Sequence, residues 1–281
     1  MTLGIVIADT YPDKRIARYA VERTLREFDA DECLLLSDTC FVAGARHIPI
    51  EPIRSIAQYN ALTLDHLPQW TACDRYLLIQ WDGFVLDGCR WRDDFVDWDY
   101  IGAPWPHMAG AVGNGGFSLR SQRLLDAVQG LRIDEPKPDV DTAEDLQICL
   151  KYRPTLQARG LRFPDAGLAG AFACERLPAT PAWAAAGTQG ISSFGFHGVF
   201  NFPFAMTEAE VLDLWDSILP RMGDSSAIWL LFVWHAWCRR YRDLGARALA
   251  ALGERNAGLW GQVTQACLAR GMSPQWLLAQ A

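Results

Sequence analysis

The sequence lacks several features that would place it in a common class. Its longest apolar run, residues 227–238, is interrupted by His235 and falls well short of the ~20 residues that span a bilayer. Basic residues are in deficit: 26 Lys plus Arg stand against 33 Asp plus Glu, which gives a formal net charge of −7. A chain this acidic is not built to coat a polyphosphate, so we expect no nucleic-acid partner.

Motifs of redox, metal-binding and hydrolytic sites are also missing. The eight cysteines form no Cys-x-x-Cys pair, so neither a zinc knuckle nor a thioredoxin-like site is indicated. Without a G-x-S-x-G elbow or an H-E-x-x-H helix, a hydrolase is the weakest enzyme hypothesis. The N-terminal segment meets an acid at Asp9 and has no basic region, which argues against a signal peptide. We therefore expect a cytoplasmic protein with reduced thiols.

What the chain does contain is a large apolar and aromatic content. Half of its 281 residues are apolar, and 12 of them are Trp. This length and composition predict one large domain, or one domain with a small appendage. So many large apolar side chains require either a deep core or a binding surface.

Apolar runs alternate with helical periodicity along the first 80 residues. Strands are predicted at 3–8, 33–36, 48–50 and 75–80, and helices at 14–28 and 55–67. This alternation predicts an α/β fold, with a mostly parallel central sheet and flanking helices. Ligands of such sheets gather beyond the carboxyl ends of the strands, where Asp9-Thr10-Tyr11 and Gln80-Trp81-Asp82-Gly83 stand here.

The character of the chain changes after residue 206. Residues 84–206 indicate short strands and loops with one clear helix at about 142–153. Thr207 and Glu210 then have the spacing of a capping box, and helices are predicted over 225–252 and 256–270. We therefore predict one domain over 1–206 and an all-helical C-terminal extension over 207–281.

Two residues are candidate ligands of a divalent cation. Asp82 follows a strand, where its carboxylate can bind a cation that bridges two phosphates, or can simply form an Asx-turn before Gly83. His197 lies between glycines and aromatics in a predicted loop, which suits a metal or phosphate ligand. The alternative for His197 is an ordinary hydrogen-bonded histidine.

A glycine-rich segment is the third candidate. Gly113-Asn114-Gly115-Gly116 lets the backbone approach a ligand closely, although the same glycines could serve only the geometry of a hairpin or bulge. It is not a P-loop, because the G-K-[ST] ending is absent, and it is not the Rossmann fingerprint.

Glu144 and Asp145 form the fourth candidate. Acids in the first turn of a helix commonly cap its N–H groups and complement its dipole. The functional alternative is that one of these carboxylates acts as a general base toward a substrate hydroxyl.

Together these clusters resemble the DUF5672 family of glycosyltransferase-like proteins of bacteria and fungi. The resemblance covers about residues 3–202 and rests on segments in a fixed order. These are Gln80-Trp81-Asp82, Trp98-Asp99-Tyr100-Ile101-Gly102-Ala103-Pro104-Trp105, residues 113–121, Glu144-Asp145, Phe172-Ala173-Cys174-Glu175 and Gly195-Phe196-His197.

The resemblance implies a GT-A fold, with a Rossmann-like nucleotide-binding half (1–105) and an acceptor half (106–206). In that fold a D-x-D motif binds Mn²⁺ or Mg²⁺ on the donor diphosphate, and a late His often completes the metal shell. Asp82 would be the last Asp of the motif and His197 the late ligand. Gln80 stands in place of the first Asp, so the metal loses one carboxylate or is not used.

The implied activity is hexosyltransferase-like transfer from a nucleotide-sugar to a glycan or lipid-linked acceptor, as in bacterial polysaccharide biosynthesis. An inverting enzyme needs one base, for which we expect Asp145, with Glu144 as second choice. Further expected substrate contacts are Thr10 and Tyr11 for base and ribose, Arg120 for the diphosphate, and the segment Gly113, Asn114, Gly115 and Gly116. Trp81 and Trp105 could stack on sugar, although core packing is favoured for both, and Arg120 could equally pair with a surface acid.

The tail and the activity each leave alternatives open. The apolar run before Arg239-Arg240-Tyr241-Arg242 resembles an interfacial helix, but burial or a homodimer contact is favoured over peripheral binding at the inner face of the membrane. The alternatives to an active transferase are an inactive nucleotide-sugar-binding protein and an interaction protein that acts through its Trp-rich helices.

Overall fold

The computed structural model describes residues 1–105, 108, 110–135, 139–176 and 190–273. The chain divides into two compact units. The first comprises residues 1–176 and 193–197, and the second includes the described residues 190–192 and 198–273. The division predicted after residue 206 stays a prediction.

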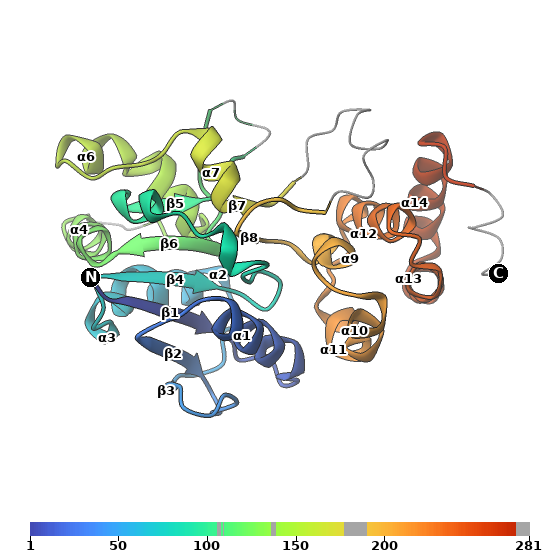
Figure 1. Ribbon diagram of the computed structural model, residues 1–281, viewed down its shortest axis with the longest axis horizontal. Coiled ribbons are helices and arrows are strands. Elements are labelled where there is room, and N and C mark those ends of the chain that lie inside the picture. The colour runs from blue at the N-terminus through green and yellow to red at the C-terminus, as the bar shows by residue number, and fades with distance from the viewer. Residues whose placement is uncertain (106–107, 109, 136–138, 177–189, 274–281) are drawn as a thin grey trace. The chain divides into compact units, whose positions relative to one another are not determined.

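The first unit is built on a six-stranded sheet in the order β3-β2-β1-β4-β6-β5 (Figure 1). Neighbouring strands from β3 to β4 pair in parallel, while β6 runs antiparallel to both β4 and β5. The strands are β1 (Leu3–Ala8), β2 (Glu32–Ser37), β3 (Arg46–Pro49), β4 (Arg75–Ile79), β5 (Tyr100–Gly102) and β6 (Phe117–Ser121). The mostly parallel α/β sheet predicted from the sequence is thus confirmed. The two halves expected on either side of residue 105 both contribute strands to it, β1 to β5 from the first and β6 from the second.

Both faces of this sheet are buried, which explains why its strands read as continuous apolar runs. Ile5 and Ile7 of β1 pack in one cluster with Ala17 and Val21 of α1 (Arg15–Glu27). The intervening Val6 belongs to a second cluster. This cluster includes side chains from α3 (Leu67–Trp70) and α4 (Gln122–Ile133).

The reversed strand β6 decides which segments meet at the carboxyl edge of the sheet. Ile79, the last residue of β4, pairs with Phe117, the first residue of β6. The glycine segment that precedes β6 therefore lies beside Gln80, which follows β4. The carboxyl end of β1 comes to the same edge, because β1 and β4 are parallel neighbours.

Two predicted helices are interrupted. The first of them begins as α2 (Ile56–Asn60), continues through a π-helical stretch (Ala61–His66) and ends in α3. The helix expected at 142–153 is divided into α5 (Glu144–Leu146), a π-helical stretch (Gln147–Lys151) and α6 (Arg153–Ala158). Wide π turns are frequent at functional sites, and α2 and α5 both supply side chains to the site described below.

The remaining elements of the first unit are short. Helix α7 (Ala166–Phe172) leads into β7 (Ala173–Cys174), which pairs in parallel with β8 (Gly195–Phe196). This two-stranded sheet brings His197, directly after β8, close to Cys174, whose carbonyl accepts a hydrogen bond from the His197 amide.

The described part of the second unit contains no strand. Its helices are α9 (Phe202–Ala205), α10 (Glu208–Asp213), α11 (Trp215–Ile218), α12 (Ser226–Cys238), α13 (Arg242–Arg255) and α14 (Ala257–Ala269). The capping box predicted at Thr207 and Glu210 is confirmed. Helices cover the predicted range 225–252, but a break divides them: Arg240 adopts a left-handed φ of 59°, which ends α12 before α13 begins.

The apolar run of the tail forms α12, whose Trp229, Phe232 and Val233 are fully buried. Helix α12 packs against α13 and α14, so the run belongs to the core of the second unit, as the sequence analysis favoured. No helix in the described part of the chain is long and apolar enough to cross a membrane.

Candidate functional site

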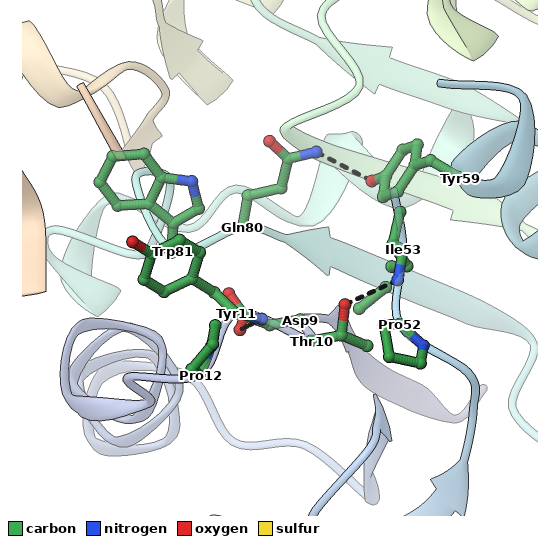
Figure 2. Close-up of a pocket in the computed structure, with 10 residues that line it drawn as sticks. Asp9, Thr10, Tyr11, Pro12, Pro52, Ile53, Tyr59, Gln80 and Trp81 are labelled. Atoms are coloured by element: carbon green, nitrogen blue, oxygen red, sulfur yellow. Dashed lines mark hydrogen bonds between the residues drawn. The ribbon is translucent and has the colours of Figure 1, made fainter. Parts of the chain in front are cut away.

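A cavity of about 340 Å³ lies beyond the carboxyl ends of β1 and β4. Its walls include Thr10, Tyr11, Ile53, Tyr59, Gln80 and Trp81, and we name it the strand-end cavity. Figure 2 shows Tyr11 and Trp81 on one side of it and Tyr59 on the other. The Thr10 hydroxyl accepts a hydrogen bond from the Ile53 amide at 2.8 Å, which ties the loop after β3 to the end of β1.

A second cavity of about 270 Å³ adjoins the first, because Tyr59 and Gln80 line both. Its other walls include Asn60, Trp105, the segment 114–116, Glu144, Asp145, Glu175 and His197, and we name it the carboxylate cavity. The structure therefore brings His197, the glycine segment and the Glu144–Asp145 pair, all singled out from the sequence, to one place. Among the described residues, none that lines either cavity is Lys or Arg.

Gln80 connects the two cavities through its side-chain amide. Its Nε2 donates to the Tyr59 hydroxyl at 2.9 Å, and its Oε1 lies 3.3 Å from His197 Nε2. Burial raises the pKa of Tyr59 above its ordinary value, and the negative charge of Glu144 adds to this effect. Tyr59 therefore stays a neutral phenol at neutral pH.

Asp82 and His197 lie side by side, as expected for ligands of one ion. Asp82 Oδ1 is 3.5 Å from His197 Nε2. Burial lowers the pKa of His197, but the charge of Asp82 and its hydrogen bond outweigh burial and raise the pKa above the ordinary 6.5. The pair is therefore electrostatically coupled.

These two side chains fit adjacent positions around a small divalent cation, to which His nitrogen and carboxylate oxygen bind at about 2.0–2.2 Å. Within the described ranges, no group of three or more His, Cys, Asp and Glu side chains is arranged to hold a metal. The protein could thus supply a partial ligand set, with water and phosphate oxygens completing it.

Each glycine of the segment before β6 accommodates a side chain of the site. A Cβ at Gly113 would overlap the Trp105 ring, one at Gly115 the Glu144 carboxylate, and one at Gly116 the His197 ring. The Gly115 amide donates to Asp145 Oδ2, and the Gly116 amide donates to Asn114 Oδ1, both at 3.2 Å. Because both amides are engaged within the protein, this geometry favours packing as the role of these glycines, and their contact with substrate stays a prediction.

The two candidate bases differ in their surroundings. Glu144 is buried and pairs with Arg120 Nη2 through Oε1 at 2.8 Å, while the neighbouring Asp145 is half-buried. Burial raises the pKa of Glu144, and the positive charge of Arg120 opposes that rise.

Arg120 is 1% exposed and is not among the lining residues of either cavity. Its guanidinium lies over the Tyr100 ring, and Nε donates to Ser118 Oγ at 3.0 Å. The alternative from the sequence, that Arg120 pairs with a surface acid, is wrong, because its partner Glu144 is buried. The structure gives its expected contact with a diphosphate no support.

The aromatic candidates both pack in cores and line cavities. Trp105 belongs to a buried cluster with Tyr100 and Leu64, and Trp81 packs against the cluster around β1. Sequence reasoning did not single out Tyr59 or Asn60, which α2 carries into the site. No motif marks them, and only the path of the chain over the sheet edge could have found them.

Comparisons with known proteins give one family and a number of structural likenesses, two of which are described below. Residues 43–197, just over half of the chain, match the family described as "Protein of unknown function (DUF5672)". No curated protein matches the chain.

Both structural likenesses are weak. A glycosyltransferase involved in glycosylation of the major capsid of PBCV-1 is 13% identical, with a TM-score of 0.47, over 77% of this chain and 100% of that one. The apo-form glycosyltransferase GlyE of Streptococcus pneumoniae TIGR4 is 16% identical, with a TM-score of 0.36, over 54% and 43% of the two chains.

The family match includes Gln80-Trp81-Asp82, the glycine segment, Glu144-Asp145 and His197, which are residues of the two cavities and their metal-site candidates. The chain belongs to the DUF5672 family.

Proposed function

We propose that this protein is a glycosyltransferase of GT-A type that moves a sugar from a nucleoside-diphosphate donor to an acceptor hydroxyl. The observation that carries the proposal is the pair of adjoining cavities at the carboxyl edge of a mostly parallel sheet. The motif resemblance described from the sequence is consistent with it.

The two cavities differ in the chemistry that they can accept. The strand-end cavity offers aromatic faces, the Tyr11 and Trp81 side chains, to a nucleoside base (Figure 2). The carboxylate cavity offers acids to sugar hydroxyls and to a reacting acceptor. A nucleotide-sugar spanning both would pass Gln80 and Tyr59 at the junction, close to His197 and Asp82.

Asp82 and His197 are the residues that would hold Mn²⁺ or Mg²⁺. A bound cation would offset the negative charge of the donor diphosphate, because the described walls of the two cavities hold no Lys or Arg that could do so. Glu144, Asp145 and Glu175 make the same cavity acidic, so it would repel a diphosphate that arrives without a counter-ion.

Asp145 is the residue proposed to take the proton from the acceptor hydroxyl. It lines the carboxylate cavity and is half-buried, and the Gly115 amide holds one of its oxygens at 3.2 Å. Glu144, the second choice from sequence, is buried and already has one carboxylate oxygen paired with Arg120.

A thermal-shift screen tests the proposal without knowledge of the acceptor. UDP-glucose, GDP-mannose, dTDP-glucose and CMP-sialic acid are each added with and without Mn²⁺, since a ligand of the folded state raises the melting temperature. We expect one of the three nucleoside-diphosphate sugars to raise the melting temperature in the presence of Mn²⁺, and Asp82→Asn to abolish the metal-dependent part. Asp93→Asn, the same change at an exposed site, is the matched control.

The other outcomes are equally informative. A shift without metal dependence would keep the transferase but remove Asp82 and His197 as ligands. Binding without release of nucleoside diphosphate, in the presence of a broad acceptor panel, would favour the inactive binding protein. No shift with any nucleotide-sugar would favour the interaction protein.

A further inference from the structure

The wall of the carboxylate cavity contains two buried acceptor atoms that no described residue of the chain hydrogen-bonds. Glu144 is 3% exposed, and its Oε1 accepts from Arg120, but its Oε2 has no partner among the described residues. Asn60 is fully buried, and its Oδ1 likewise has no partner in the described chain.

The orientation of the Asn60 side chain is fixed by its own amide hydrogens. Nδ2 donates to the Val140 carbonyl at 3.0 Å and to the Thr142 carbonyl at 2.8 Å. Both hydrogens are thus used, and the amide cannot be turned over without losing both bonds. The oxygen is therefore the atom left for a ligand.

Glu144 is held with similar firmness. Arg120 binds its Oε1, while Arg120 itself is anchored by Ser118 Oγ at Nε and by the Tyr100 ring below the guanidinium plane. Gly115 has no side chain where a Cβ would overlap the carboxylate. Arg120 is therefore a positioning residue that leaves the second carboxylate oxygen to whatever enters the cavity.

The chemistry of the cavity selects the class of ligand. Buried acceptors that stay unpaired are costly, so a ligand that occupies this wall must bring hydrogen-bond donors. An anionic group would meet Glu144 and Asp145, and a purely apolar group would leave both oxygens unpaired. Trp105 and Tyr59 add aromatic faces to the same cavity, and a sugar combines donor hydroxyls with apolar C–H faces.

We propose that Glu144 Oε2 and Asn60 Oδ1 accept hydrogen bonds from hydroxyl groups of a sugar in the carboxylate cavity. This inference rests on the proposed function, and it assigns Glu144 to sugar recognition and leaves proton transfer to Asp145. The sugar is either the one carried by the donor nucleotide or the acceptor, and the experiment distinguishes the two sources.

The first measurement isolates the contribution of the sugar to donor affinity. Isothermal titration compares UDP with UDP-glucose, GDP with GDP-mannose, dTDP with dTDP-glucose and CMP with CMP-sialic acid, on wild type and on Glu144→Gln. The variant keeps an oxygen for Arg120 and turns a donor toward the cavity. If the recognised sugar belongs to the donor, the factor by which the sugar increases affinity over the bare nucleotide should be at least tenfold smaller in Glu144→Gln than in wild type. The affinity for the bare nucleotide should change less than twofold.

The matched control is Glu22→Gln, the same chemical change at an exposed position of α1. It should leave both affinities unchanged. Because loss of the Glu144 carboxylate leaves Arg120 buried without its partner, a second measurement is made on wild type alone.

That measurement uses saturation-transfer NMR with methyl glucoside, methyl galactoside and methyl mannoside and their monodeoxy analogues. A site built to bind a hydroxyl strongly rejects the analogue that lacks it, so we expect at least one deoxy analogue to bind tenfold more weakly. If glycosides bind in this way while the donor gain is unchanged in Glu144→Gln, the recognised sugar is the acceptor.

Failure of the inference and failure of the proposed function give different results. The inference alone would be overturned by two results together. In Glu144→Gln the sugar would still add its full share to the affinity for a nucleotide-sugar, and wild type would bind all deoxy analogues equally. Glycoside binding that discriminates among the deoxy analogues, without any nucleotide binding, would overturn the proposed function alone. Binding of neither class of ligand would overturn both.

Discussion

At the scale of single residues, the distinction between Asp145 and Glu144 is the most direct to test. The Asp145 carboxylate accepts from the Gly115 and Leu146 amides; Asp145→Asn keeps the volume of the side chain and an oxygen for one of these two amides, but removes the base. We expect turnover to fall about 10²–10⁴-fold, the usual worth of a general base, with donor affinity nearly unchanged. Initial rates of nucleoside diphosphate release, with a titration of donor binding, measure both quantities.

Asp141→Asn is the control, because Asp141 is exposed four residues before Asp145 and lines neither cavity. Its turnover should equal that of wild type. If Asp145→Asn also kept full turnover, the base would have to be another group of the carboxylate cavity.

Alanine substitutions at Gly115 and Gly130 are expected to change the free energy of unfolding in opposite directions. Gly115→Ala would place a Cβ on the Glu144 carboxylate and should destabilise the protein by about 1–3 kcal/mol, the usual cost of overpacking. Gly130 lies in α4 with open space around its Cα, so Gly130→Ala should stabilise by about 0.5–1 kcal/mol. Urea unfolding measures both, and equal effects of the same sign would contradict this account.

Sequence reasoning found the site residues that belong to motifs and missed those that only the path of the chain delivers. Asp82, Glu144, Asp145 and His197 stand in recognisable clusters, and three of the four line one cavity. Tyr59 and Asn60 sit in an ordinary helical pattern, and nothing local distinguishes a residue that faces a cavity from one that faces the core. The burial of Arg120 was equally invisible, because it depends on a partner 24 positions away.

At the scale of elements, the capping box of α10 is a testable source of stability. The Thr207 hydroxyl accepts from the Glu210 amide at 3.3 Å, while Glu210 Oε2 accepts from the Thr207 amide at 2.8 Å. Thr207→Ala removes one of these reciprocal bonds and should cost about 1 kcal/mol. Thr264→Ala, at a half-buried position within α14 where the hydroxyl only bonds back to the Trp260 carbonyl, is the control and should cost little, since Ala is the better helix former. Equal losses in urea unfolding would refute the capping assignment.

Strands were the most predictable elements, and helix continuity was the least. Apolar runs bounded by polar turns located β1 to β4, since strands buried on both faces carry a strong and local signal. The π-helical stretches and the left-handed Arg240 were not predicted, because the apolar spacing of a helix continues across them. Packing in the folded protein determines where these helices are interrupted. The antiparallel insertion of β6 is a matter of topology, which local patterns do not encode.

At the scale of the whole molecule, we expect the free energy of unfolding to fall in acid, and the buried base His235 contributes to this loss as well as the carboxylates. His235 is 1% exposed, its Nδ1 lies 2.7 Å from the Phe200 carbonyl, and its ring contacts Phe204. Burial lowers the pKa of His235 to about 4 from the ordinary 6.5, although the hydrogen bond to Phe200 opposes the shift. The folded protein therefore holds His235 neutral, and the unfolded chain binds the proton first.

Between these two pKa values the unfolded state carries the extra proton, so the free energy of unfolding falls as the pH falls from 6.5 toward 4. For shifts of this size, about 2 kcal/mol of stability is lost between pH 7 and pH 5 through His235 alone. His235→Asn retains a donor for the Phe200 carbonyl but cannot titrate, so its unfolding free energy should fall less over this interval by about that amount. Urea unfolding of both proteins at pH 7, 6 and 5 measures the difference, which does not depend on the carboxylates common to both. Parallel pH profiles would show that His235 does not link protonation to unfolding, and that the acid sensitivity of the molecule comes from its carboxylates instead.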